Sequence, residues 1–361
     1  MQSWMPHVRV AVPSWLEARL YVAAAYVVTW AVIDRLEPPP DFSPIEDGLL
    51  AWDGSWYHQI AEDGYADAAD PAVRFFPLWP LLGRWVGLLF GGRSDIALVL
   101  LANGFALVAG VLLHRLVLEE TGDARLARRS VRMLALFPAA FVLVLAYSEP
   151  LFLSLAIGLF LVLRHQRWAV AALLGYLAGL TRPVGSLLAV GVAVVVWRDQ
   201  AWRRPGALAA IVAAPLGSAT FVLWAHLALD DWRAPLDRQR ELRGNATEPF
   251  TRWFSGIGDA VRGDEGEMLH VIAVAVLIGL MIVVARRLPL EMTAFTVVSV
   301  IVLVSADNLN SMERYALATF PLIIAVAMIS RRPIFDRWLP TASAVGLVSL
   351  TTLALNGVYV P

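Results

Sequence analysis

The sequence predicts an all-α, polytopic membrane protein with about eleven transmembrane helices, and two observations indicate this class. First, 58% of the 361 residues are hydrophobic and 16% are charged, whereas soluble domains are nearer to half apolar and a quarter charged. Second, apolar stretches that approach the width of a bilayer follow one another along the chain. We expect one membrane domain over residues 1–361, with spans near 17–35, 95–118, 131–147, 150–164, 168–181, 184–197, 206–229, 269–285, 290–305, 315–330 and 338–356.

Missing residue types narrow the chemistry. The chain has no cysteine, which excludes disulfides, thiol catalysis and cysteine metal sites. Every basic residue is an arginine, which also excludes Schiff-base chemistry on lysine. A formal net charge of -1 argues against nucleic acid, which requires a concentrated basic face. There is no HExxH motif, no P-loop and no closely spaced set of metal ligands, so we expect neither a metal nor a cofactor.

The predicted orientation depends on one ambiguous segment. Residues 75–90 (FFPLWPLLGRWVGLLF) are apolar enough to span, but Pro77, Pro80 and Arg84 interrupt them. If this segment lies flat on the membrane, the arginine-rich connections after every second span share one side, which the positive-inside rule makes cytoplasmic. The stretch Leu20–Ile33 is then a retained first span rather than a signal peptide. We therefore expect a multi-pass plasma-membrane protein with a cytoplasmic N-terminus.

Two large segments face outward in this topology, at about 37–94 and 230–268. The first contains most of the acidic residues that have no basic neighbour in the sequence: Asp41, Glu46, Asp47, Asp53, Glu62, Asp63, Asp67 and Asp70. We expect these loops to cover the membrane domain and to hold the site on its outer face.

The densest group of candidate residues is WDGSWYHQIAEDGY in the first outward segment. Asp53 precedes Gly54, so we expect a tight turn that exposes the carboxylate at the membrane surface. Trp56 and Tyr57 follow at the spacing of one face of a short interfacial helix. The alternative is an amphipathic surface helix with solvated acids, and His58 is by itself more typical of a solvated residue.

Polar groups also occur at the outward ends of later spans, where they are costly unless they have a purpose. Glu149 lies in YSEP, Arg182 in TRP, and Arg314 and Tyr315 in SADNLNSMERY. These charges could simply neutralise one another. An arginine fork is also well suited to phosphate oxygens, and a carboxylate to a sugar hydroxyl.

Five motifs in one order give the chain a family resemblance: WDGSWYHQIAEDGY, FFPLWPLLGR, YSEPLF, LAGLTRPVG and SMERYALATFPL. From about Trp52 to Pro321 the sequence resembles the GPI mannosyltransferase II family (the PIG-V type) of the GT-C glycosyltransferase superfamily. The resemblance implies an inverting mannosyltransferase with juxtamembrane helices and a polyprenyl- or dolichyl-phosphate-mannose donor. The arginine-only composition indicates a bacterial member, and bacteria lack GPI anchors. The donor class therefore transfers to this chain better than the acceptor does.

The resemblance also implies residue roles. Asp53 matches the acidic residue of the first outer loop that is taken as the catalytic base in such families. A departing phosphate needs positive charge, which makes Arg182 and Arg314 candidates for the donor phosphate site. The other predicted substrate contacts are Trp52, Trp56, Tyr57, His58, Glu149 and Tyr315, of which the first three could form stacking walls for the sugar.

We expect three kinds of partner: the polyprenyl-phosphate-mannose donor, a glycan or glycolipid acceptor, and membrane lipids. Two other functional classes compete with the enzyme. A transporter or flippase of lipid-linked glycans typically has internal repeats and charges near mid-membrane, and a non-catalytic subunit could scaffold another glycosyltransferase. The polar groups here gather at one membrane face, which favours the enzyme.

Overall fold

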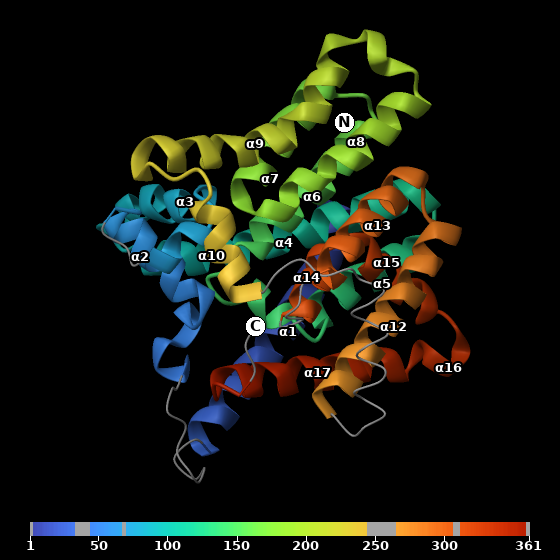
Figure 1. Cartoon of the computed structure of the whole chain (residues 1–361). Helices are drawn as coiled ribbons and strands as arrows, with labels where there is room; N and C mark the ends of the chain where they lie inside the picture. The colour runs from blue at the N-terminus through green and yellow to red at the C-terminus, as the bar shows by residue number, and fades with distance from the viewer. Residues whose placement is uncertain (1–2, 33–43, 67–69, 244–264, 306–310, 359–361) are drawn as a thin grey trace.

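All regular secondary structure among the described residues is helical (Figure 1). The computed structural model describes residues 3–32, 44–66, 70–243, 265–305 and 311–358, and the predicted all-α class is confirmed for them. The α-helices are α1 (Met5–Val32), α2 (Asp53–Asp63), α3 (Leu78–Gly87), α4 (Ser94–Thr121), α5 (Ala124–Leu136), α6 (Glu149–Leu163), α7 (Trp168–Thr181), α8 (Leu188–Arg198), α9 (Pro205–Leu229), α10 (Ala234–Arg243), α12 (Glu265–Arg287), α13 (Leu290–Val304), α14 (Met312–Ala318), α15 (Phe320–Ile329), α16 (Pro333–Asp336) and α17 (Trp338–Leu355). Short 3₁₀ helices join them: η2 (Pro44–Leu50), η3 (Asp70–Arg74), η4 (Leu88–Phe90), η5 (Ala140–Leu143), η6 (Pro183–Leu187) and η7 (Ala201–Arg203).

Among the described residues, three helices are long and apolar enough to cross a membrane: α4, α9 and a helix over Ile334–Leu355 that contains α17. Together α14 and α15 also reach this length, but they are bent by 90° at the break between them. Other predicted spans are shorter apolar helices, at Glu149–Leu163, Trp168–Thr181, Pro183–Arg198 and Leu290–Val304. The predicted number of eleven spans is therefore not confirmed within the described residues.

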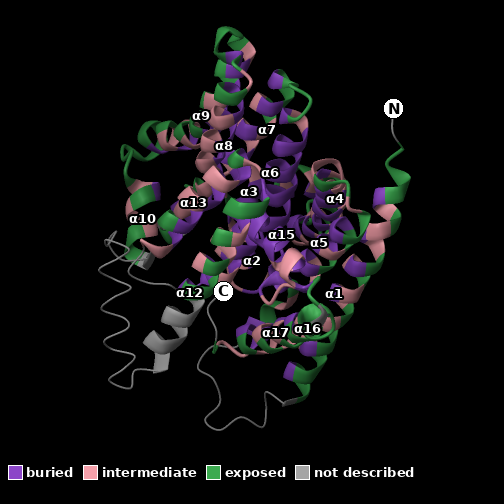
Figure 2. Ribbon diagram, turned by 90° about the vertical axis from the view of Figure 1, so that its right-hand side faces the viewer, coloured by how far each residue is buried: buried purple, intermediate pink, exposed green. Residues whose placement is uncertain are grey.

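The short helices occur where protein, rather than lipid, surrounds them. In α6 every residue except Val162 is buried, and the helix packs between α4 and α7 in the middle of the bundle (Figure 2). A helix that is apolar all round is typical of such a core position. Because other helices enclose it, its length of 15 residues does not have to match the bilayer.

The prediction of a single span over 131–147 is wrong. The helix α5 ends at Leu136, Pro138 follows, and the chain continues through η5 into irregular backbone. Proline has no N–H to donate and disfavours the helical conformation at the preceding residue, here Phe137 (φ -55°, ψ 141°). Burial explains the hydrophobicity that suggested a span, since every residue in 139–148 is buried.

The predicted span 315–330 is also interrupted. Helix α14 ends at Ala318 and α15 begins at Phe320, with Pro321 in its first turn. Proline is tolerated in the first turn of a helix, but it cannot extend a helix that began earlier. The bend leaves Arg314 on the short helix α14, where its side chain is buried. The preceding residues 306–310 lie outside the described part of the chain.

Two N-terminal segments can be compared with the predicted membrane topology. Helix α1 already begins at Met5, well before the predicted start of the first span at position 17. Residues 78–90 form α3 and η4, and α3 packs against α4. Trp85, Leu88 and Leu89 of this segment are exposed, and an exposed apolar face suits a helix at a lipid surface. The flat placement of this segment stays a prediction.

Exposed tryptophans mark two levels of the molecule. One set lies near the arginine-rich connections and consists of Trp4, Trp197, Trp202 and Trp338. The other set lies at the opposite ends of the helices and consists of Trp30, Trp85 and Trp232. Tryptophan concentrates at both interfaces of membrane proteins. Together with the long apolar helices, this distribution is typical of a membrane protein.

Candidate active site

Four charged side chains from four separate elements meet at the end of the bundle that is remote from the arginine-rich connections. Asp53 is the first residue of α2 and Glu149 the first residue of α6. Arg182 follows the last residue of α7, and Arg314 lies in α14. The structure thus brings together the predicted base, both predicted phosphate contacts and one predicted substrate contact.

Local backbone geometry places the carboxylate of Asp53. The turn falls at Trp52, whose φ of 62° lies in the left-handed region, and not at Gly54 as the sequence suggested. The Trp52 indole Nε1 donates to the Ala354 carbonyl oxygen of α17 at 2.8 Å, which holds this strained turn. Gly54 packs against the segment that precedes Glu149, and an added Cβ would lie 3.4 Å from the Ala146 Cβ, about the distance of an ordinary van der Waals contact.

The four groups form a chain of alternating charge. Asp53 Oδ2 is paired with Arg314 Nη1, and Arg314 Nε lies 3.2 Å from Glu149 Oε1. The same Glu149 oxygen is paired with Arg182 Nη1. Neither Glu149 oxygen nor Arg314 Nε has a partner with hydrogen-bond geometry among the described residues, so these contacts are ionic. Two negative and two positive charges balance within the cluster.

Exposure separates the members of this cluster. The side chain of Glu149 is 0% exposed, those of Arg182 and Arg314 are 7% and 8% exposed, and that of Asp53 is 18% exposed. Removing charges from water costs several kcal/mol per ion, so a contribution to fold stability is a weak explanation for the cluster. Asp53 is the member that a substrate can reach most easily.

Aromatic hydroxyls and rings surround the cluster. The Tyr315 ring lies 5.4 Å from the Arg182 guanidinium and 5.5 Å from that of Arg314, within the range of a cation–π contact. The Tyr57 hydroxyl and the Ser148 hydroxyl are 2.8 Å apart, and Arg182 Nη1 donates to Ser148 at 3.2 Å. Burial raises the pKa of Tyr57 well above its usual range, so its hydroxyl keeps its proton.

The remaining predicted contacts are held by protein groups. His58 Nδ1 lies 2.8 Å from Ser94 Oγ, and the Trp56 ring stacks on Phe75 at 6.1 Å between centroids. Tyr57 is buried. Because Glu149 has no exposed side-chain surface, the predicted contact between Glu149 and a substrate would require the cluster to open. The substrate roles of these residues stay predictions.

Sequence reasoning missed two residues that contact the site. Tyr147 is fully buried; its hydroxyl accepts from the Asp53 backbone N–H at 3.4 Å, and its ring lies 5.4 Å from the Arg314 guanidinium. Ser148 joins Tyr57 to Arg182. The two residues immediately before Glu149 are Tyr147 and Ser148. Their polar groups next to an acid in an apolar segment were the sequence signal that could have identified them as site residues.

Comparisons with known proteins show a distant structural likeness and no sequence match. No family profile and no curated protein matches the sequence, and the resemblance to a mannosyltransferase family stays a prediction. The chain is similar to the crystal structure of the Archaeoglobus fulgidus oligosaccharyltransferase in complex with Zn and sulfate, with 13% identity and a TM-score of 0.47. The match covers 96% of this chain and 53% of that one, so the present chain spans about half of its length. The activity of the present chain therefore has to be argued from its own residues.

Proposed function

We propose that the chain is an inverting glycosyltransferase of the GT-C type, which moves mannose from polyprenyl-phosphate-mannose to a glycan or glycolipid acceptor at the outer face of the plasma membrane. The observation that carries this proposal is the cluster of Asp53, Arg314, Glu149 and Arg182. Transfer from a sugar phosphate needs a base for the acceptor proton and cations for the departing phosphate. The order of the sequence motifs supports mannose as the sugar.

The surroundings of the arginines suit a phosphate that is attached to a lipid. Tyr315, which contacts both guanidinium groups, also lines a small hollow with room for about one water molecule. Most of the other lining side chains are apolar, among them Phe152, Phe295 and Val302, and Val302 is exposed. A phosphate bound at the arginines would have an apolar surface beside it, against which the hydrocarbon chain of the donor could lie.

The transfer would be a displacement at the anomeric carbon. The acceptor hydroxyl oxygen forms a bond to C1 of the sugar while the bond from C1 to the phosphate oxygen breaks, which inverts the configuration. Asp53 receives the hydroxyl proton. The polyprenyl phosphate leaves with the electron pair of the broken bond, and Arg182 and Arg314 stabilise its charge.

Arg314 links the two halves of this reaction. Its Nη1 is paired with Asp53 in the present structure. A donor phosphate that binds Arg314 competes with Asp53 for the same N–H groups, because a guanidinium has a fixed set of donors. Donor binding therefore frees the Asp53 carboxylate to accept the proton of the acceptor hydroxyl.

Membranes that contain the overexpressed chain test this proposal. They are supplied with polyprenyl-phosphate-[³H]mannose, and the membranes provide their own acceptors. We expect label to move from the donor into a glycan or glycolipid fraction, and no transfer in membranes without the chain. Movement of the intact donor across vesicles of purified protein, with no transfer, would indicate the transporter instead. Transfer that requires a second glycosyltransferase would indicate the scaffold.

A further inference from the structure

Arg19 carries a charge inside the first predicted span, yet no ion pair joins it to a carboxylate among the residues that the structure describes. Its guanidinium donates three hydrogen bonds: Nε to Asn103 Oδ1 at 3.0 Å, Nη1 to the Trp15 carbonyl at 3.2 Å and Nη2 to the Leu143 carbonyl at 2.9 Å. It also lies 4.3 Å from the centre of the Trp15 ring. A charged side chain at membrane depth is costly and usually has a function.

Asn103, which accepts a hydrogen bond from Arg19, itself binds the residue that follows Leu143 in the chain. Its Nδ2 donates to the Val144 carbonyl at 3.0 Å, and its backbone carbonyl accepts from the Trp15 indole at 2.9 Å. Arg19 of α1 and Asn103 of α4 therefore hold two successive carbonyl groups, those of Leu143 and Val144. Both carbonyls lie at the end of η5, where a helix leaves its last C=O groups without internal partners.

The segment that these two side chains hold leads directly into the candidate site. Residues 144–148 belong to no helix and are all buried, and irregular backbone at membrane depth is tolerated only when its polar groups are satisfied by protein. The Ala146 carbonyl is satisfied by the Trp79 indole at 3.1 Å and its N–H by the Leu49 carbonyl at 2.9 Å. Three residues further on, the chain reaches Glu149.

We infer that Arg19, with Asn103, is a positioning residue for the transfer reaction, which acts by fixing segment 143–148. This inference rests on the proposed function. The segment presents two groups to the cluster, the Tyr147 hydroxyl at the Asp53 N–H and the Ser148 hydroxyl at Arg182, and it leads directly into Glu149, which is paired with Arg182. Arg19 itself contacts none of these three residues, so its effect on them is transmitted through the backbone.

A labelling experiment tests the positional part of the inference without any transferase activity. The chain has no cysteine, so a single Ala146→Cys reports on the segment and Ala171→Cys on the core of α7; both alanines are 0% exposed. Each is combined with Arg19→Gln, and labelled in detergent with a maleimide. We expect Arg19→Gln to speed the labelling at position 146 by about tenfold, as for one lost hydrogen bond to a buried group, and to leave position 171 unchanged.

The control is Arg132→Gln, which removes the same charge from an arginine that is 49% exposed and paired with Glu17, and which should change neither rate. Equal labelling at position 146 with and without Arg19→Gln would overturn the inference. A parallel rise at both positions would also overturn it, because the loss would then be a general loosening of the bundle.

Turnover of polyprenyl-phosphate-mannose tests the functional part. We expect Arg19→Gln to lower turnover at least tenfold and Arg19→Lys to recover part of it, because an ammonium group can replace some but not all of the three hydrogen bonds. Faster labelling at position 146 with wild-type turnover would contradict a positioning role. If the wild-type chain itself transfers no sugar, the proposed function fails, whereas the labelling result still decides the positional claim.

Discussion

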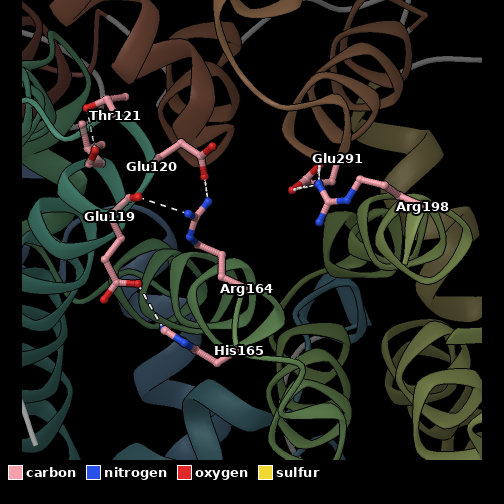
Figure 3. Close-up of polar contacts among 8 residues, drawn as sticks. Glu119, Glu120, Thr121, Arg164, His165, Arg198 and Glu291 are labelled. Carbon is pink, nitrogen blue, oxygen red and sulfur yellow. Dashed lines mark hydrogen bonds and ion pairs between the residues drawn. The ribbon is translucent and has the colours of Figure 1, made fainter. Parts of the chain in front are cut away.

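Charged side chains gather at both ends of helix α6, but the two groups differ in how far they are buried. At its N-terminal end, Glu149 and the two arginines next to it are less than a tenth exposed. At its C-terminal end, Arg164 pairs with Glu120 of α4, and Arg198 of α8 pairs nearby with Glu291 of α13 (Figure 3). Arg164 and Arg198 are 31% and 47% exposed, so each of these pairs reaches solvent through its arginine, although Glu291 itself is 7% exposed.

This difference separates two uses of ion pairs. Pairs that reach solvent contribute about 0–1 kcal/mol each and mainly keep arginines at one membrane face. A buried cluster pays a desolvation cost that its Coulomb energy only partly offsets, so stability alone is a weak reason for it. We interpret the exposed end as the anchor of the bundle and the buried end as its functional end.

The first prediction concerns which end faces outward, and its outcome is all or none. Ala66 follows α2 in the first predicted outer segment, and Ala124 begins α5 at the arginine-rich end; both are exposed. In intact cells, an impermeant maleimide should label Ala66→Cys and should not label Ala124→Cys until the cells are opened. The reverse pattern would place the arginines outside and remove the outer-face site.

The second prediction compares the loss of one carboxylate at each end. Glu149→Gln leaves two buried arginines with one negative charge too few, so we expect it to destabilise the fold by about 3–5 kcal/mol. Glu120→Gln should cost less than about 1 kcal/mol. Thermal unfolding of both variants in the same detergent gives the comparison. Similar melting temperatures would show that burial does not distinguish the two ends.

The third prediction compares the loss of an arginine from the buried cluster with the loss of an arginine at the exposed end. Arg182→Ala and Arg314→Ala should each weaken kcat/KM for the donor by roughly 1–3 kcal/mol, as expected when a charged hydrogen bond to phosphate is lost. Lysine at either position should restore only part, because the planar fork is gone. Arg164→Ala is the matched control and should leave donor use unchanged, because Arg164 and its partner Glu120 are 31% and 17% exposed. Normal donor use in the first two variants would reduce these arginines to members of a structural ion network.

The fourth and smallest prediction concerns the cap of α5 at the arginine-rich end. Asp123 accepts from the Arg125 and Leu126 N–H groups at 2.9 and 3.0 Å, and the bond from Leu126 is the main cause that lowers the pKa of Asp123. Asp123→Ala should cost about 0.5–2 kcal/mol at neutral pH. Because the folded-state pKa is the lower one, the contribution of Asp123 is present above about pH 4 and lost in more acidic solution. The melting temperatures of the variant and the wild type should therefore converge as the pH falls to 3.

Sequence patterns could predict the helical class and the end of the bundle at which the candidate residues gather, whereas the membrane face of that end stays a prediction. Arginine placement put Asp53, Arg182 and Arg314 at one end, and the structure brings them together. Pro138 was an available signal for the break after Leu136, but the burial of the segment that follows could not be predicted, because a segment inside a bundle is as apolar as one that crosses lipid. The role of Arg19 was equally hidden, since its partners Asn103 and Leu143 are far apart in the sequence and contribute backbone and amide groups rather than charges.

The central claim is that Asp53 is the base, and one pair of variants tests it most directly. Asp53→Asn keeps the size of the side chain but removes its basicity, whereas Asp63→Asn makes the same change at an exposed position of the same helix. With polyprenyl-phosphate-mannose as donor, we expect Asp53→Asn to lower turnover by about 10²–10⁴-fold, the usual contribution of a positioned base, and Asp63→Asn to leave it nearly unchanged. A folded Asp53→Asn variant that keeps more than about a tenth of wild-type turnover, well above that range, would contradict the account.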